Sequence, residues 1–144
     1  MKATEIEISY KKGVEHSRAI SDSKSAFKVL IQNWNLNQIE ILEEFFLIML
    51  NNSNQLMGIY PLSKGGRTST IVDTKILFSI ALKCNSTSII LAHNHPSGIL
   101  KPSNSDKQLT KRIKQAGEIL ELKVLDHLII NRTSYFSFAD NGLL

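Results

Sequence analysis

The chain has 144 residues and a mass of 16.2 kDa, which is the length of one domain of ordinary size. Hydrophobic residues make up 42% and charged residues 21%, which excludes a disordered chain, and a net charge of +4 falls short of dedicated nucleic-acid binders. The single cysteine excludes an intramolecular disulfide and a multi-cysteine zinc site. The apolar runs are too short to span a bilayer, and the charged N-terminus lacks a signal-peptide core, so we expect a cytoplasmic protein without a membrane partner.

The first elements in chain order are predicted from alternation and from helix-capping residues. Residues 3–10 alternate Ile6, Ile8 and Tyr10 with polar residues, which is the period of a half-buried strand. Residues 22–34 follow side-chain oxygens suited to an N-cap and carry apolar residues at helical spacing, so they predict a helix. Residues 45–50 and 55–62 predict two strands, joined by a turn at the polar residues 51–54.

The second half of the chain alternates helices and strands. Residues 73–84 predict a helix capped by Asp73, and the apolar, β-rich residues 88–92 predict a central strand buried on both faces. A helix over about 103–120, a strand at 124–130 and a short strand at 135–138 follow. This order predicts one α/β (α+β) domain over residues 1–144, with a mixed β-sheet flanked by helices.

Residues with metal-binding chemistry gather just after the predicted central strand. Residues two apart on a strand point to the same face, so His93 and His95 can converge on one point while Asn94 faces away. The chain then turns and enters a helix that carries Asp106 in its first turn. Two imidazoles and one carboxylate are a common ligand set for catalytic zinc, with the fourth position left to water. We therefore predict a Zn²⁺ site at His93, His95 and Asp106.

Two residues near this segment keep alternative interpretations. Ser103 and Asp106 also have the spacing of a capping box, in which Ser103 caps the helix and the carboxylate reaches back to it. Ser103 can cap the helix and still present its hydroxyl to the site. His127 lies in a later apolar strand and is either a partner of a zinc ligand or a buried histidine with no role in the site.

These residues resemble the signature of the JAB/MPN (JAMM) metalloproteases, in which a glutamate precedes a His-x-His pair, a serine and an aspartate. Here the matching residues are Glu43, His93, His95, Ser103 and Asp106. The string HNHPSG and the later strings LDHLII and YFSFADNG are similar to the RadC-like branch. The resemblance covers about residues 30–144, and residues 1–30 contribute only a predicted strand and the start of a helix. Full-length RadC proteins carry a preceding helix–hairpin–helix domain that has no room here, so we expect a stand-alone RadC-like domain.

The resemblance implies a role for each matching residue. His93, His95 and Asp106 would bind Zn²⁺, Glu43 would be the general base toward the water that zinc activates, and Ser103 would hydrogen-bond the oxyanion of the tetrahedral intermediate. The adjacent Glu44 is a rival for the base, because neighbours on a strand face opposite sides. The family pattern E-x-F-x-x-x-x-L favours Glu43, which stands two residues before a phenylalanine.

Two function classes follow from these observations. The first is a zinc-dependent metallopeptidase or isopeptidase, a hydrolase with a protein or peptide substrate. The alternative is a DNA-repair-associated, nucleic-acid-linked accessory protein whose fold binds metal without hydrolysis. The three-residue ligand set favours the hydrolase, because a structural zinc normally has four protein ligands. The net charge of +4 permits a nucleic-acid partner and supports it only weakly.

Overall fold

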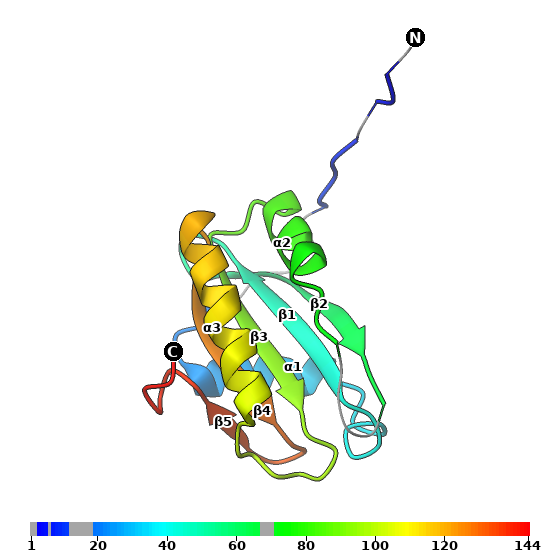
Figure 1. Cartoon of the computed structure of the whole chain (residues 1–144), viewed down its shortest axis with the longest axis vertical. Helices are drawn as coiled ribbons and strands as arrows, with labels where there is room; N and C mark the ends of the chain where they lie inside the picture. Colours follow the sequence, from blue (N-terminus) through cyan, green and yellow to red (C-terminus); the bar gives the residue numbers. More distant parts are fainter. Residues whose placement is uncertain (1–2, 6, 12–18, 67–70) are drawn as a thin grey trace.

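The computed structural model describes residues 3–5, 7–11, 19–66 and 71–144. Within these ranges the chain forms one five-stranded sheet and three helices (Figure 1). The elements in chain order are α1 (Ser23–Asn33), β1 (Glu44–Leu50), β2 (Leu56–Lys64), α2 (Thr74–Lys83), β3 (Ser88–Asn94), α3 (Asn104–Ile119), β4 (Lys123–Ile130) and β5 (Tyr135–Ser137). The predicted α+β domain with a mixed sheet is confirmed.

The sheet has the strand order β2-β1-β3-β4-β5 and combines two hairpins with two crossover connections, one through α2 from β2 to β3 and one through α3 from β3 to β4. β1 runs antiparallel to both β2 and β3, and β5 runs antiparallel to β4. β3 and β4 are parallel, and α3 connects them, as parallel neighbours require a crossover. β3 is therefore the central strand, and every one of its residues is buried, as its apolar sequence predicts.

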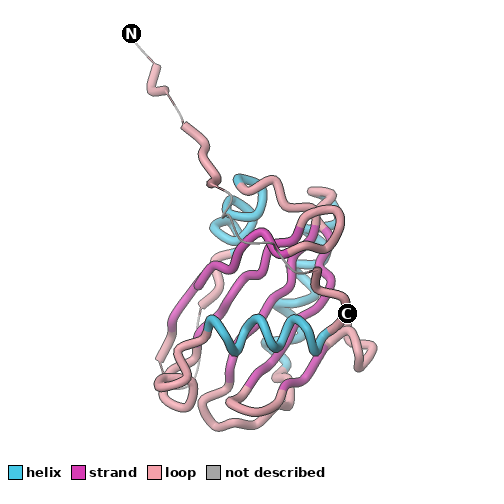
Figure 2. Tube along the Cα trace, turned by 180° about the vertical axis from the view of Figure 1, so that it is seen from behind, coloured by secondary structure: helices cyan, strands magenta, loops and turns pink. Residues whose placement is uncertain are grey.

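Helices cover both faces of the sheet and divide the core into two layers. α2 and α3 lie on the face seen in Figure 1, whereas α1 crosses the opposite face, seen in Figure 2. Leu30 of α1 packs with alternate residues of β1 and β3 on one face, and Leu77 of α2 and Ile113 of α3 pack on the other. Alternation along β1 sends neighbouring residues to different layers, so Phe45 and Phe46 belong to opposite faces of the sheet.

Side-chain caps fix the start of each helix where the sequence predicts one. The carboxylate of Asp22 accepts a hydrogen bond from the Ser25 N–H, and that of Asp73 accepts from the first turn of α2. Ser103 and Asp106 form a reciprocal capping box at α3. In the described part of the chain, no helix combines the length and apolar composition that a bilayer crossing needs.

The strand predicted over residues 3–10 is wrong for the residues that the structure describes there. Residues 3–5 and 7–10 belong to no strand, Ile8 is 73% exposed, and Ile6 lies outside the described residues. The described N-terminal residues extend away from the sheet (Figure 1), and the Tyr10 hydroxyl donates a hydrogen bond to the Met57 carbonyl over 2.8 Å. An alternating segment becomes a β-strand only when its backbone pairs with a neighbouring strand, and one side-chain contact with β2 does not provide that backbone pairing.

Candidate metal centre

The three predicted ligands come together where the end of β3 lies next to the start of α3. His93 is the sixth residue of the buried strand β3 and is only 2% exposed, and His95 follows directly after the strand. Asp106 is held in the first turn of α3, where its backbone N–H is capped by Ser103. Because β3 is anchored between β1 and β4, the strand fixes the direction of the His93 imidazole, whereas that of His95 is held by the Ile99 carbonyl, and the capped helix brings the carboxylate to both.

The donor atoms of these three side chains already have the spacing of a metal site. The Nε2 atoms of His93 and His95 are 3.0 Å apart, and they lie 3.2 and 3.4 Å from the two carboxylate oxygens of Asp106. Ligands placed about 2.0–2.2 Å from one zinc ion at tetrahedral angles would be roughly 3.3–3.6 Å apart. These three side chains therefore need little rearrangement to hold a divalent cation. Among the described residues, they form a group of histidine and aspartate side chains that could bind a metal ion.

Electrostatics at the site also favour a bound cation. Burial opposes ionisation of Asp106, but its contacts with His93 and His95 outweigh that effect and hold the pKa of the carboxyl well below its usual range. Burial lowers the pKa of His93, so its imidazole is neutral at physiological pH. His95 directs its Nδ1 to the Ile99 carbonyl at 2.7 Å, and a carbonyl only accepts, so the ring carries its hydrogen there. The contact with Asp106 raises the pKa of His95. An ionised carboxylate and the Nε2 atoms of two imidazoles thus face one point.

The capping box predicted at Ser103 and Asp106 is confirmed, and its geometry is compatible with a second role of these residues at the candidate site. The Ser103 N–H donates to a carboxylate oxygen of Asp106 at 2.7 Å, and the Asp106 N–H donates to the Ser103 hydroxyl oxygen at 3.1 Å. The same carboxylate faces the two histidines, so the cap orients the candidate ligand rather than competing with it. The Ser103 oxygen accepts in this contact, so its own hydrogen remains available for donation toward the cavity.

The two adjacent glutamates point in different directions. Glu43 stands just before β1, is 9% exposed, and lines the same cavity as the three ligands and Ser103. Glu44 lies on the other side of the strand, with its carboxylate 3.5 Å from the Lys64 ammonium. Burial raises the pKa of the Glu43 carboxyl. The strand alternation thus places Glu43 at the site and Glu44 away from it, and the role of Glu43 as a base stays a prediction.

Asn94 connects the two histidines to the segment that carries Glu43, a contact that the sequence did not predict. Its fully buried amide faces away from the ligands, as expected for the residue between them. The amide oxygen accepts from the Glu44 N–H at 2.8 Å, and the amide nitrogen donates to the carbonyls of Ile39 and Leu42 at 2.6 and 2.8 Å. Leu42 and Glu44 flank Glu43, so Asn94 holds the backbone on both sides of that residue.

His127 is a buried histidine that also contacts a candidate ligand. It is completely buried on β4, and its Nε2 lies 2.8 Å from the Nδ1 of His93. Its Nδ1 lies 2.6 Å from the hydroxyl of Thr110 on α3. The sequence could have indicated Thr110, because it stands four residues after Asp106 and therefore on the same face of the helix.

The ligands, Glu43 and Ser103 line one cavity of about 480 Å³. Its wall adds apolar and polar side chains that the sequence did not single out, namely Phe45, Ile71, Val72, Ser105, Leu109 and Arg112. A volume of this size is within the range of about 300–1,000 Å³ of ligand sites. The cavity therefore has room for a ligand with apolar groups beside the candidate metal centre.

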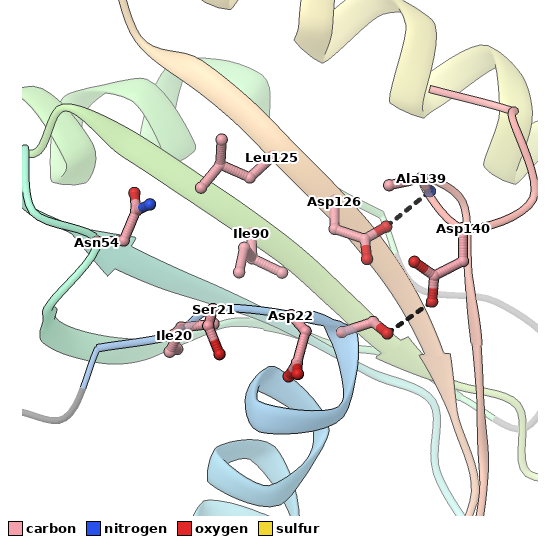
Figure 3. Close-up of a pocket in the computed structure, with 10 residues that line it drawn as sticks. Ile20, Ser21, Asp22, Asn54, Ile90, Leu125, Asp126, Ala139 and Asp140 are labelled. Carbon is pink, nitrogen blue, oxygen red and sulfur yellow. Dashed lines mark hydrogen bonds between the residues drawn. The ribbon is translucent and has the colours of Figure 1, made fainter.

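A second cavity of about 280 Å³ lies on the α1 side of the sheet and contains three carboxylates, Asp22, Asp126 and Asp140 (Figure 3). Each of them accepts a hydrogen bond from the protein: Asp22 from a backbone N–H of α1, Asp126 from the Ala139 N–H at 3.0 Å, and Asp140 from the Ser23 hydroxyl at 2.6 Å. Its lining residues include neither histidine nor cysteine. Among the described residues, the histidines of the candidate metal centre thus line the first cavity and not the second.

Comparison with known proteins identifies the family of this chain. The family model described as RadC-like JAB domain matches residues 20–143. A UPF0758 protein of Flavobacterium johnsoniae is 55% identical over 101 residues, which are 70% of this chain and 44% of that protein. A UPF0758 protein of Porphyromonas gingivalis is 44% identical over 103 residues, which are 71% of this chain and 45% of that protein.

The chain therefore belongs to the family of RadC-like JAB domains. The region that it matches spans less than half the length of these relatives.

Proposed function

We propose that this domain is a zinc-dependent metallopeptidase or isopeptidase that hydrolyses an amide bond in a protein or peptide. The observation that carries the proposal is the convergence of His93, His95 and Asp106, with donor atoms 3.0–3.4 Å apart, in a cavity that also contains the buried Glu43 carboxyl. Three protein ligands leave a fourth coordination position for water or substrate, which is the pattern of catalytic zinc.

Zinc would supply a Lewis acid that lowers the pKa of water and polarises the substrate carbonyl. Glu43 would take a proton from the attacking water and return it to the leaving amine. Its buried position supports this role, because burial raises the pKa of the carboxyl toward the pH at which a general base works best. Asn94 would hold Glu43 at a fixed distance from the two histidines through its bonds to the flanking backbone.

Ser103 would donate its free hydroxyl hydrogen to the oxyanion that forms when water adds to the carbonyl. The backbone N–H of Asp106 already holds the serine oxygen, so the donor is oriented before the reaction begins. The apolar wall formed by Phe45, Val72 and Leu109 would exclude water and receive apolar groups of the substrate. Each of these residues acts through its position in the same cavity.

The test is cleavage of peptide and isopeptide substrates by zinc-loaded wild type, Glu43→Gln, Ser103→Ala and the matched control Glu44→Gln. Loss of a general base should lower kcat by about 10²–10⁴ with little change in KM. Loss of one oxyanion donor should lower kcat by about 10–10³. Glu44→Gln should retain wild-type activity, because its side chain lies outside the cavity.

Equal activity of wild type and Glu43→Gln at equal zinc content would refute the catalytic assignment. Salt-sensitive DNA binding by a protein that cleaves no amide would instead favour the nucleic-acid-linked accessory role.

A further inference from the structure

Behind the candidate ligands, four side chains and one carbonyl form a closed ring of polar contacts. The Nδ1 of His93 is 2.8 Å from the Nε2 of His127, and the Nδ1 of His127 is 2.6 Å from the Thr110 hydroxyl. That hydroxyl is 2.6 Å from the backbone carbonyl of Asp106, whose carboxylate is 3.2 Å from the Nε2 of His93. The ring joins β3, β4 and α3, the three elements that surround the site.

Thr110 sets the direction of the hydrogen bonds in this ring. A carbonyl only accepts, so Thr110 donates its single hydroxyl hydrogen to Asp106. The hydroxyl oxygen can then only accept from His127, which must carry its hydrogen on Nδ1. The neutral ring of His127 leaves a lone pair on Nε2, and this lone pair accepts from the Nδ1–H of His93. A neutral His93 with its hydrogen on Nδ1 then has its lone pair on Nε2, 3.2 Å from the Asp106 carboxylate, an arrangement that a cation between the two would stabilise.

The surroundings of His127 support the neutral ring that this order requires. The residue is completely buried, and the rings of Phe45 and Phe138 lie 5.5 and 4.7 Å from it. A charged imidazole enclosed by aromatic rings would lose its hydration without an anion in contact. The described contacts of its two nitrogens are His93 and Thr110, and neither supplies a negative charge.

We propose that Thr110 is a positioning residue that acts through His127 to fix the tautomer and ring orientation of His93, so that Nε2 presents a lone pair to the metal. This inference rests on the proposed metal site. His95 needs no such relay, because its Nδ1 donates directly to the Ile99 carbonyl. A hydrogen-bond acceptor behind a metal-bound histidine fixes its tautomer, and loss of such a partner commonly weakens metal binding.

The experiment compares Thr110→Val, which keeps the shape of the side chain without its hydroxyl, with Thr110→Ser, which keeps the hydroxyl. In metal-free protein with ¹⁵N-labelled histidine, long-range ¹H–¹⁵N spectra report which nitrogen of each ring carries the hydrogen. Wild type and Thr110→Ser should show Nδ1–H forms of His93 and His127, and Thr110→Val should show mixed forms. Chelator competition should give a zinc Kd about 10–100-fold weaker for Thr110→Val and close to wild type for Thr110→Ser.

A purely structural role of Thr110 would leave the tautomers and the zinc Kd unchanged in Thr110→Val, and either result would overturn the proposal. Thr110→Ala replaces Thr110→Val if the valine variant fails to fold. If wild type itself binds no zinc, the proposed function fails, and the tautomers of the metal-free proteins still decide whether Thr110 sets the ring of His93.

Discussion

Removal of the Asn94 amide is expected to weaken the fold at the point where it meets the site. Asn94→Ala deletes one acceptor and two donor contacts, to the Glu44 N–H and to the carbonyls of Ile39 and Leu42. The side chain is fully buried, so the backbone groups lose their partners without gaining full access to water. Because Leu42 and Glu44 flank Glu43, the backbone of that residue loses its connection to β3 as well.

The size of the effect follows from the number of bonds. Each buried hydrogen bond contributes about 0.5–1.5 kcal/mol net, and groups left unsatisfied cost more, so we expect a loss of about 3–5 kcal/mol. A domain of 144 residues unfolds with an entropy of roughly 300 cal/mol/K, so a loss of about 3 kcal/mol lowers Tm by about 10 °C. This is a large part of the roughly 5–15 kcal/mol that stabilises a typical domain.

The assay is equilibrium urea unfolding, with thermal melting as a second measurement. Asn33→Ala is the matched control, because Asn33 is exposed and makes a single bond to the Val29 carbonyl, and it should change stability by no more than about 0.5 kcal/mol. If Asn94→Ala unfolds at the same urea concentration as Asn33→Ala, the role assigned to the amide is wrong. In an active enzyme, Asn94→Ala should also lower kcat, because Glu43 is no longer held against the histidines.

Three further predictions concern stability. Burial raises the pKa of Glu43 above its ordinary 4.5, so ionisation of this carboxyl destabilises the metal-free fold as pH rises through the raised pKa. Glu43→Gln should therefore be more stable than wild type at about pH 7, but not at about pH 4. A variant less stable than wild type at neutral pH would contradict this. A methyl group on Gly117 would lie 2.5 Å from the Leu122 carbonyl oxygen, so Gly117→Ala should cost about 1–3 kcal/mol in urea unfolding, whereas Gly66→Ala, which meets open space, should not. Zinc at about 100 times its Kd should add about 2.7 kcal/mol of stability, and an equal gain in His95→Ala would remove that residue from the ligand set.

The elements with strong local signals could be predicted from the sequence. Asp73 and Ser103 mark the start of their helices because a side-chain oxygen before an apolar helical pattern satisfies free backbone N–H groups. His93 and His95 share a face because strand geometry alone fixes the direction of residues two apart, and Asp106 follows in the next capped turn. These features depend on neighbours along the chain, so a pattern of residue types contains them.

Features that depend on distant partners could not be predicted. Asn94 bonds to groups 50 to 55 residues away, and Thr110 meets His127 only because α3 packs beside β4. The strand predicted from Ile6, Ile8 and Tyr10 failed for the same reason, since an alternating segment carries no information about whether a free strand edge will accept it. Packing, which the linear pattern does not specify, decides each of these contacts.

The residues that we infer to orient the candidate ligands lie outside the motif by which such domains are recognised. His93, His95 and Asp106 belong to one short stretch of chain, whereas the hydroxyl and the imidazole behind them come from α3 and β4. If the inference holds, a lineage could keep the motif intact and lose tight metal binding through one apolar substitution at Thr110. A genome survey that counts metal-binding domains by the motif alone would include such lineages. Scoring positions 110 and 127 together with the candidate ligands would separate those lineages from the ones that keep tight metal binding.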